Sequence, residues 1–397
     1  MLLYIHIPYC ISKCSYCDFF SRPCGSSQYV PDSYIEALCR EISFRLSFYR
    51  IKKLETIYIG GGTPSLISAG QFTKLFSEIR KNTEVDENTE ITVEVNPDDV
   101  SISLLESLSA CGVNRISCGI QSMNDRALKY AGRRADAVTN ARALSLFSRF
   151  WKGDLSIDLI SGLPEDDENS LISSLKEVCD VNPCHISLYS LTIEEETPFG
   201  KQLAEGKLNY DFEEADRLWL IGRDFLEKKG YQWYEVSNFC KSGKECKHNL
   251  GYWNHKDYTG CGSGACGTIY SKNGAGFRWT GTYDLEKYID FWNSQAVEKN
   301  LEINKADLPQ INEEIDISKS EFEFFMMGLR KLNGISSLEY KEIFGKALPD
   351  HFIKLFNDWE KKGLCEIKSA DKTEKEKRYC LSRQGILFLN RFLEELI

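Results

Sequence analysis

Residues 2–20 read LLYIHIPYCISKCSYCDFF, a short apolar run followed at once by three closely spaced cysteines, Cys10, Cys14 and Cys17. The residues after them supply no fourth thiolate. A structural zinc site closes its tetrahedron with four protein ligands, and a [4Fe–4S] cluster held by protein alone uses four cysteines. Three cysteines can therefore hold three irons of a cluster and leave the fourth iron open to an external ligand. A zinc knuckle and incidental core cysteines are the alternatives that this spacing leaves open.

The bulk composition is that of an ordinary globular protein of two or three domains. The chain has 397 residues, a net charge of −10, 42% hydrophobic residues and 27% charged residues. The acidic balance argues against nucleic-acid binding, which uses a concentrated basic face. No apolar run approaches the roughly 18 residues that span a bilayer, and no signal-peptide pattern opens the chain. We therefore expect a cytoplasmic protein without a membrane span, whose fifteen cysteines are mostly reduced thiols.

Strand-like runs alternate with amphipathic helical patterns over the first half of the chain. Together with the run at 2–7 they make about six β–α units, and such alternation predicts an α/β fold with a parallel sheet. Periodicity does not distinguish an open doubly wound sheet from a partial or full barrel. In either architecture the functional edge is formed by the carboxyl ends of the strands. The later strands are expected at 56–59, 90–95, 115–120, 155–160 and 185–191.

The rest of the chain predicts further segments. The β–α units occupy 1–197, and an α+β extension with a glycine-rich and aromatic-rich stretch follows at 198–300. The charged residues 301–318 are typical of a linker. Residues 319–397 combine helices with a short hairpin, which is typical of a winged-helix unit, although the acidic balance argues against DNA binding.

Glycine and polar residues gather at the expected carboxyl ends of the strands. Gly60 to Gly62 follow the second strand, where the lack of side chains lets the backbone approach a ligand, and a bare glycine turn is the alternative. Glu94 ends a strand of apolar residues, so its carboxylate needs a partner, and a ribose diol is a suitable one. Three further residues could bind ligand atoms, with surface or capping roles as the alternative: Gln121, Arg133 and Asp158.

Residues 246–253, CKHNLGYW, place a histidine close to a tyrosine and a tryptophan. Such a histidine could be an axial ligand of haem iron, and the aromatic rings could pack against the macrocycle. On spacing alone, a hydrogen-bonded structural histidine is the stronger interpretation. His6 in the first strand and Cys246 are similarly ambiguous.

Together these patterns resemble the oxygen-independent coproporphyrinogen III oxidase family of the radical S-adenosylmethionine (radical SAM) superfamily. The resemblance covers nearly the whole chain. It rests on YIHIPYC with CxxxCxxC at 4–17, GGGTP at 60–64, EVNP at 94–97, GIQS at 119–122, DLISGLP at 158–164 and YEVSNF at 234–239. Within this family, HNLGYW at 248–253 resembles the HNxxYW motif of the HemW-type haem chaperones.

The resemblance implies a partial (β/α) barrel of radical SAM type with an added α+β region and a small C-terminal winged-helix-like domain. It implies a [4Fe–4S] cluster on Cys10, Cys14 and Cys17, with S-adenosylmethionine on the open iron and haem as cargo. The implied residues near S-adenosylmethionine are Tyr4, Tyr16, Gly61, Glu94 and Arg133. In the oxidase branch, a second S-adenosylmethionine lies beside positions that match Gly62, Thr63, Gln121 and Asp158. The candidate haem residues are His248, Asn249, Tyr252 and Trp253.

Two features separate the chaperone branch from the oxidases. The oxidases resemble CxxxCxxCxC, whereas Phe19 stands here at the place of the extra cysteine. They also carry an N-terminal extension, whereas this chain begins a few residues before Tyr4. We therefore expect a haem chaperone that delivers haem to acceptors such as respiratory haemoproteins, with the enzymatic decarboxylation of coproporphyrinogen III as the alternative. A homodimer is compatible with the sequence, and productive use of the adenosyl radical is left open.

Overall fold

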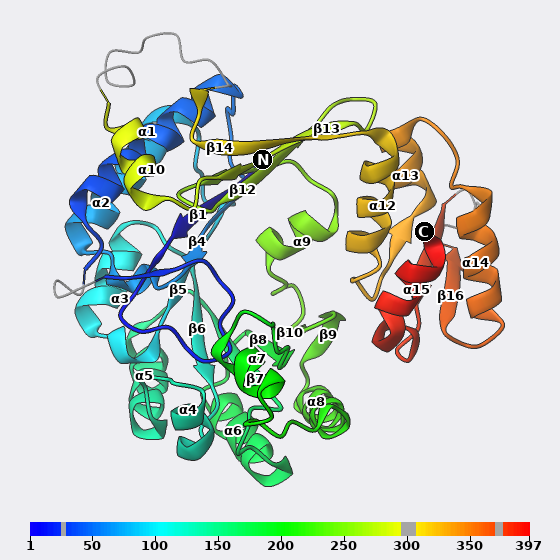
Figure 1. The fold of residues 1–397 in the computed structure, drawn as a ribbon, viewed down its shortest axis with the longest axis horizontal. Coiled ribbons are helices and arrows are strands. Elements are labelled where there is room, and N and C mark those ends of the chain that lie inside the picture. The colour runs from blue at the N-terminus through cyan, green and yellow to red at the C-terminus, as the bar shows by residue number, and fades with distance from the viewer. Residues whose placement is uncertain (25–28, 295–306, 370–375) are drawn as a thin grey trace.

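The computed structural model describes residues 1–24, 29–294, 307–369 and 376–397, which form a large curved sheet with a smaller domain beside it (Figure 1). The main sheet has twelve strands in the order β14-β13-β12-β11-β1-β4-β5-β6-β7-β8-β10-β9. Its edge strands, β14 (Gln310–Ile315) and β9 (Gln232–Glu235), do not pair with each other within the described chain. The sheet is therefore open, as a partial barrel is.

The centre of the sheet is parallel, and helices connect its consecutive strands. The central strands are β1 (Leu2–Ile7), β4 (Thr56–Gly61), β5 (Glu90–Val95), β6 (Arg115–Gln121), β7 (Asp154–Ser161) and β8 (His185–Ser190). The connecting helices are α1 (Asp32–Phe48), α2 (Ala69–Asn82), α3 (Ile102–Ala110), α4 (Asp125–Tyr130), α5 (Ala137–Phe150) and α6 (Glu168–Asp180). The predicted parallel α/β arrangement is confirmed.

The two faces of the central strands differ in polarity. Successive side chains of a strand point to opposite faces. In β4, Ile57 and Ile59 are fully buried in the apolar core that the connecting helices cover. Tyr58 lies between them on the other face, where its hydroxyl reaches Glu94 of β5. The inner, concave face of the sheet is therefore the polar face, and we call the space along it the lumen.

Further strands extend the sheet at both ends. At one end, β10 (Asn238–Cys240) and β9 run antiparallel to their neighbours. At the other end, β11 (Tyr258–Cys261) lies parallel to β1, followed by β12 (Cys266–Tyr270), β13 (Gly276–Gly281) and β14. The other helices of this region are α7 (Pro198–Ala204), α8 (Phe212–Lys228) and α10 (Leu285–Trp292).

Residues 310–315 differ from the linker that the charged sequence at 301–318 predicts, because they pair with β13 and form the edge strand β14. The first part of that stretch, 301–306, lies outside the described residues. In the described part of the chain, no helix has the length and apolar character that crossing a membrane requires.

Helix α9 (Lys247–Trp253) lies inside the curve of the sheet, at the amino ends of the central strands (Figure 1). Glu90, the first residue of β5, accepts hydrogen bonds from the backbone N–H groups of Lys247 and His248 at 3.1 and 3.0 Å. Gly251 packs on Leu2 of β1, where a Cβ atom would come within 2.3 Å of the leucine side chain. These contacts hold α9 at the end of the lumen opposite the cysteine loop.

The C-terminal domain is winged-helix-like. In chain order it contains α12 (Ile317–Gly328), β15 (Ile335–Ser336), α13 (Ser337–Phe344), α14 (Asp350–Glu360), the hairpin β16 (Cys365–Ser369) and β17 (Lys377–Leu381), and α15 (Leu389–Leu396). Its core is built largely from stacked and edge-on aromatic rings, among them Phe325, Tyr340, Phe352, Phe356 and Phe392.

Candidate functional site

The cysteine loop leaves the carboxyl end of β1 and is closed at its base by backbone pairing. β2 (Tyr9–Cys10) pairs with β3 (Arg22–Pro23) in parallel. Cys10, Cys14 and Cys17 are half-buried thiols, none of them in a disulfide. Two of the sulfurs already have donors: Thr63 Oγ1 donates to Cys10 Sγ at 3.3 Å, and Arg133 Nη1 donates to Cys14 Sγ at 3.7 Å. Donors of this kind stabilise a thiolate.

The three thiols are spread around the cysteine loop. Across the described residues, no three His, Cys, Asp or Glu side chains converge as the ligands of one metal ion do. In a [4Fe–4S] cluster each thiolate binds a different iron, so ligands spread around a loop are suitable. Burial raises the pKa of the Cys10 and Cys17 thiols. A metal bound to these sulfurs would favour their deprotonated form.

The glycine turn after β4 packs directly against the base of the cysteine loop. Gly61 has a φ of +112°, and a Cβ atom there would come within 2.4 Å of the His6 ring. A Cβ atom on Gly62 would come within 2.7 Å of the Tyr9 carbonyl oxygen. Both positions therefore require glycine, which lets the backbone of the turn lie close to the cysteine loop.

Glu94 lies on the lumen face of β5 with a donor on each carboxylate oxygen. The Tyr58 hydroxyl donates to Oε1 at 2.7 Å, and the Gly61 N–H donates to Oε2 at 3.1 Å. Burial nevertheless raises the pKa of Glu94 from 4.5 to about 7, and repulsion from Asp158 adds to the rise. A ligand that donates further hydrogen bonds would stabilise the charged carboxylate.

Arg133 connects the cysteine loop to the ends of the neighbouring strands. Besides Cys14, its guanidinium donates to the Gly119 carbonyl at 2.6 Å and to Asn96 Oδ1 at 3.4 Å, while its buried Nε atom has no partner in the described structure. Gln121 nearby has a φ of +66° and a buried Oε1 that also lacks a partner there. Strained backbone and unsatisfied polar atoms are features that functional sites often show.

Asp158 of β7 is a second lumen carboxylate. It accepts hydrogen bonds from the Ser117 hydroxyl at 3.1 and 2.8 Å on its two oxygens. Burial raises its pKa as well. Two carboxylates that face one lumen and repel each other favour a ligand rich in hydroxyl or amino donors.

Tyr4 and His6 tie β1 to the end of the cysteine loop. His6 Nε2 lies 2.9 Å from the Phe20 carbonyl, which can only accept, so this nitrogen carries the proton. The other ring nitrogen then accepts from the Tyr4 hydroxyl at 2.9 Å. Tyr16, a residue of the loop itself, packs against a small apolar cluster that includes Phe199, and burial raises the pKa of its phenol.

His248 of α9 is buried and fully hydrogen-bonded. Its ring nitrogens lie 2.6 Å from Thr56 Oγ1 and 2.9 Å from the Tyr252 hydroxyl, and the residue is only 1% exposed. Burial lowers its pKa to about 3, so the ring is neutral. It also stacks on Tyr58, with ring centroids 5.0 Å apart. Asn249 and Trp253 are half-buried.

The predicted residues thus form two groups. The cysteines and most residues predicted to contact S-adenosylmethionine lie at the carboxyl ends of the strands, whereas Tyr4 and Asp158 lie in the middle of β1 and β7. His248 and Tyr252 lie at the amino ends, with Tyr58 touching both His248 and Glu94. Sequence reasoning missed Tyr58 and Ser117, although Tyr58 shares the period-two polar pattern of β4 with Thr56.

Comparison with known proteins gives a consistent result over the whole chain. A family model described as the radical SAM superfamily matches residues 4–178. Proteins named heme chaperone HemW are similar along the full length. The protein from Haemophilus influenzae is 34% identical, with 99% of this chain and 96% of the relative aligned. Those from Escherichia coli and Bacillus subtilis are 33% and 34% identical, with 99% of this chain and 97% and 99% of the relatives aligned.

Among solved structures, coproporphyrinogen III oxidase (HemN) from Escherichia coli, described as a radical SAM enzyme, has a similar fold. The match has a TM-score of 0.80 and covers 100% of this chain and 89% of that chain. The sequences are 21% identical, so this likeness concerns the fold alone.

Replacing Glu94 by glutamine should change how stability depends on pH. Because the pKa of Glu94 is raised from 4.5 to about 7, the folded chain keeps a proton that the unfolded chain has released between these values. The free energy of unfolding contributed by this group therefore falls as pH rises through that window. Glu94→Gln should raise the free energy of unfolding at pH 8 by roughly 1–3 kcal/mol and hardly change it at pH 4. Denaturant unfolding at several pH values measures both.

The control is Glu87→Gln, at an exposed position in the same part of the chain. Identical pH profiles for the Glu94→Gln and Glu87→Gln variants would contradict the assignment of a raised pKa to Glu94.

Proposed function

The chain belongs to the HemW family of the radical SAM superfamily, and on that premise we propose that it is a haem chaperone, which binds haem and delivers it to acceptor proteins. The observation that carries this proposal is the similarity to relatives named heme chaperones, at 33–34% identity across 99% of this chain. The acceptors would be haemoproteins such as those of respiration. A cytoplasmic location and a homodimer stay predictions from the sequence.

We propose that Cys10, Cys14 and Cys17 hold a [4Fe–4S] cluster that leaves one iron for S-adenosylmethionine. When bound, these groups would supply one-electron chemistry. The donors from Thr63 and Arg133 support this assignment, because they would stabilise the sulfurs as thiolates.

S-adenosylmethionine would lie across the glycine turn, with its ribose diol donating to Glu94 and its amino group near the backbone of Gly61. Arg133 would attract the methionine carboxylate, and Tyr4 and Tyr16 would shape the two sides of the site. The remaining candidates are proposed to bind polar groups of the same S-adenosylmethionine or of a second one: Gly62, Thr63, Gln121 and Asp158.

The proposed haem residues are His248, Asn249, Tyr252 and Trp253. For His248 to ligate iron, one of its ring nitrogens must first become free. Since both of its ring nitrogens are engaged, it could ligate iron only after its hydrogen bond to Tyr252 or to Thr56 opens. A bound haem iron at His248 would therefore require the Tyr252 side chain to turn away within α9, or the His248 ring to leave Thr56 of β4.

Oxygen-independent oxidation of coproporphyrinogen III is not favoured as the alternative. At the place of the extra oxidase cysteine this chain carries Phe19, whose side chain is 69% exposed. The whole-chain relatives are named haem chaperones, whereas the likeness to the oxidase concerns only the fold.

Anaerobic reconstitution should load about four irons per chain, and alanine at Cys10, Cys14 or Cys17 should abolish the cluster, because three thiolates are its only protein anchors. Iron analysis and visible absorption measure the loading. Cys24→Ala is the matched control, since Cys24 is a buried cysteine whose backbone N–H donates to the Cys10 carbonyl at 3.0 Å. Loss of the cluster in Cys24→Ala together with its retention in Cys14→Ala would overturn the assignment.

S-adenosylmethionine should perturb the EPR spectrum of the reduced cluster by binding its open iron. Glu94→Ala should weaken this binding by about tenfold or more, because a hydrogen bond to a charged group contributes roughly 1.5–3 kcal/mol. Tyr58→Phe, which removes one donor to Glu94 but keeps the ring, should have a smaller effect. A spectrum that stays unchanged at saturating S-adenosylmethionine would count against the radical SAM assignment.

The chaperone and oxidase functions are separated by two measurements on the same protein. Haem should bind with a shifted Soret band, and coproporphyrinogen III should not be turned over by the reconstituted protein with S-adenosylmethionine and a reductant. His248→Ala should weaken or alter the haem spectrum through loss of the candidate axial ligand. His351→Ala, at an exposed position on α14, should leave it unchanged.

Robust formation of protoporphyrinogen IX would favour the oxidase instead. If haem binds but His248→Ala leaves the spectrum untouched, the chaperone function stands while the ligand assignment fails. His6, Cys246 and His255 are then the next positions to test.

A further inference from the structure

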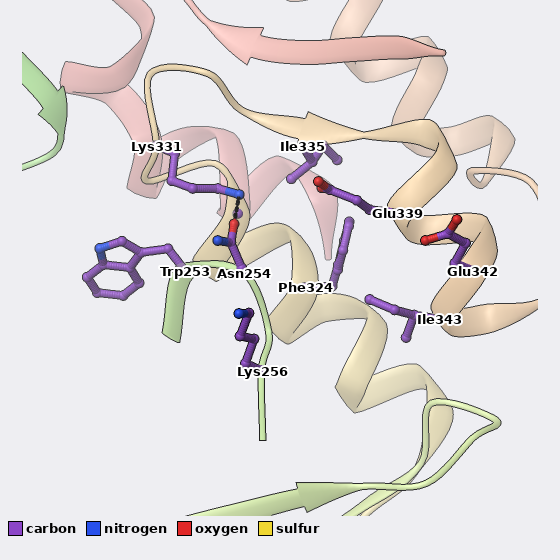
Figure 2. A pocket seen from close by; sticks show the side chains of 10 residues that line it. Trp253, Asn254, Lys256, Phe324, Lys331, Ile335, Glu339, Glu342 and Ile343 are labelled. Atoms are coloured by element: carbon purple, nitrogen blue, oxygen red, sulfur yellow. Dashed lines mark hydrogen bonds between the residues drawn. The ribbon is translucent and has the colours of Figure 1, made fainter. Parts of the chain in front are cut away.

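A cavity of about 260 Å³ lies where the end of α9 meets the C-terminal domain (Figure 2). We call it the seam pocket. The core of the protein contributes the end of the HNLGYW segment and the residues that follow it. The C-terminal domain contributes apolar side chains, one buried lysine and two carboxylates, Glu339 and Glu342. The lining residues used below are Trp253, Asn254, Phe324, Lys331, Ile335 and Ile343.

The backbone around Lys331 is fixed by the edge of the main sheet. Lys331 pairs with Glu235 of β9 in an antiparallel bridge. On either side, the Val236 N–H donates to the Arg330 carbonyl and the Leu332 N–H donates to the Tyr234 carbonyl, both at 3.1 Å. The lysine is therefore presented from a sheet edge, where its position is well defined, and not from a free loop.

The amino group of Lys331 is buried and forms no ion pair of its own among the described residues. The residue is 4% exposed, and its amino group donates to Asn254 Oδ1 (Figure 2). An ammonium group has three N–H donors, and this neutral amide accepts only one. Glu339 also lines the pocket, but its carboxylate is paired with Arg378 at 3.3 Å. Burial lowers the pKa of Lys331 to about 8, and the attraction of Glu339 offsets only part of this effect.

Apolar and aromatic side chains form part of the wall around this amino group, and Lys256, Glu339 and Glu342 complete it. Phe324, Ile335 and Ile343 line the side that belongs to the C-terminal domain (Figure 2). On the core side, the Trp253 indole has the guanidinium of Arg330 5.2 Å from its ring centroid. The cavity is smaller than the roughly 300–1,000 Å³ of sites that enclose a drug-sized ligand. It therefore fits a short carboxylate-bearing arm of a larger apolar ligand.

We propose that the seam pocket binds a propionate side chain of haem, with the Lys331 ammonium as its counter-ion. This inference rests on the proposed haem-chaperone function and does not depend on which residue ligates the iron. It gives the C-terminal domain a direct part in haem binding, across the seam from Trp253.

The test titrates haem and haem dimethyl ester, in which both propionates are blocked, into the reconstituted full-length protein and into Lys331→Met, with the Soret band as readout. The wild-type protein should bind haem about tenfold more tightly than Lys331→Met does, because a charge-assisted hydrogen bond is lost. The ester should bind both proteins with the same, weaker affinity. Lys331→Arg should retain most of the affinity for haem, since it keeps the charge.

Lys354→Met, at an exposed position on α14, is the matched control and should bind haem as the wild-type protein does. Equal haem affinity of the wild-type protein and a folded Lys331→Met variant overturns the proposal. If Lys331→Met does not fold, the affinities of the wild-type protein for haem and for haem dimethyl ester still test the proposal. Equal affinities of the wild-type protein for the two compounds also overturn the proposal. Failure of the wild-type protein to bind either porphyrin would instead refute the proposed function itself.

Discussion

The alternation of apolar and polar residues along the parallel strands is the constraint on which the rest of this structure depends. Ile57 and Ile59 of β4 join the apolar core under the helices, and the side chain between them, Tyr58, must then face the lumen. The same period places Glu94 and Ser117 side by side in register on β5 and β6. The curved sheet thus covers its outer face with helices and keeps a polar concave face, along which the carboxylates and tyrosines gather.

Glu94 connects the two ends of the lumen, because it contacts one residue from each end. Its carboxylate accepts from Gly61, which packs against the cysteine loop, and from Tyr58, which stacks on His248 of α9. The raised pKa of Glu94 is a consequence of collecting these groups in a water-poor space. Any movement of α9 that releases His248 would alter the support of Tyr58, so the two ends of the site are physically connected.

The C-terminal domain completes the core instead of standing apart from it. Its backbone at Arg330 and Leu332 pairs with β9 and so covers an edge strand that would otherwise expose its hydrogen-bonding groups. This pairing places Lys331 beside the end of α9. The pairing that covers the edge strand β9 therefore also places the buried Lys331 in the seam pocket.

The local pattern of the sequence determined the strands, the connecting helices, the cysteine loop and the glycine turn, because each depends on the period and residue types of a short segment. It also marked Glu94 as a strand-end carboxylate, whereas Asp158, expected at a strand end, lies in the middle of β7. The partners of these groups lie on other strands, so only the register of the folded sheet decided that Tyr58 would meet Glu94. In the same way, the environment of His248, the pairing of residues 310–315 with β13 and the burial of Lys331 were decided by the tertiary structure. They arise from contacts between segments far apart in the chain, and no local pattern encodes such contacts.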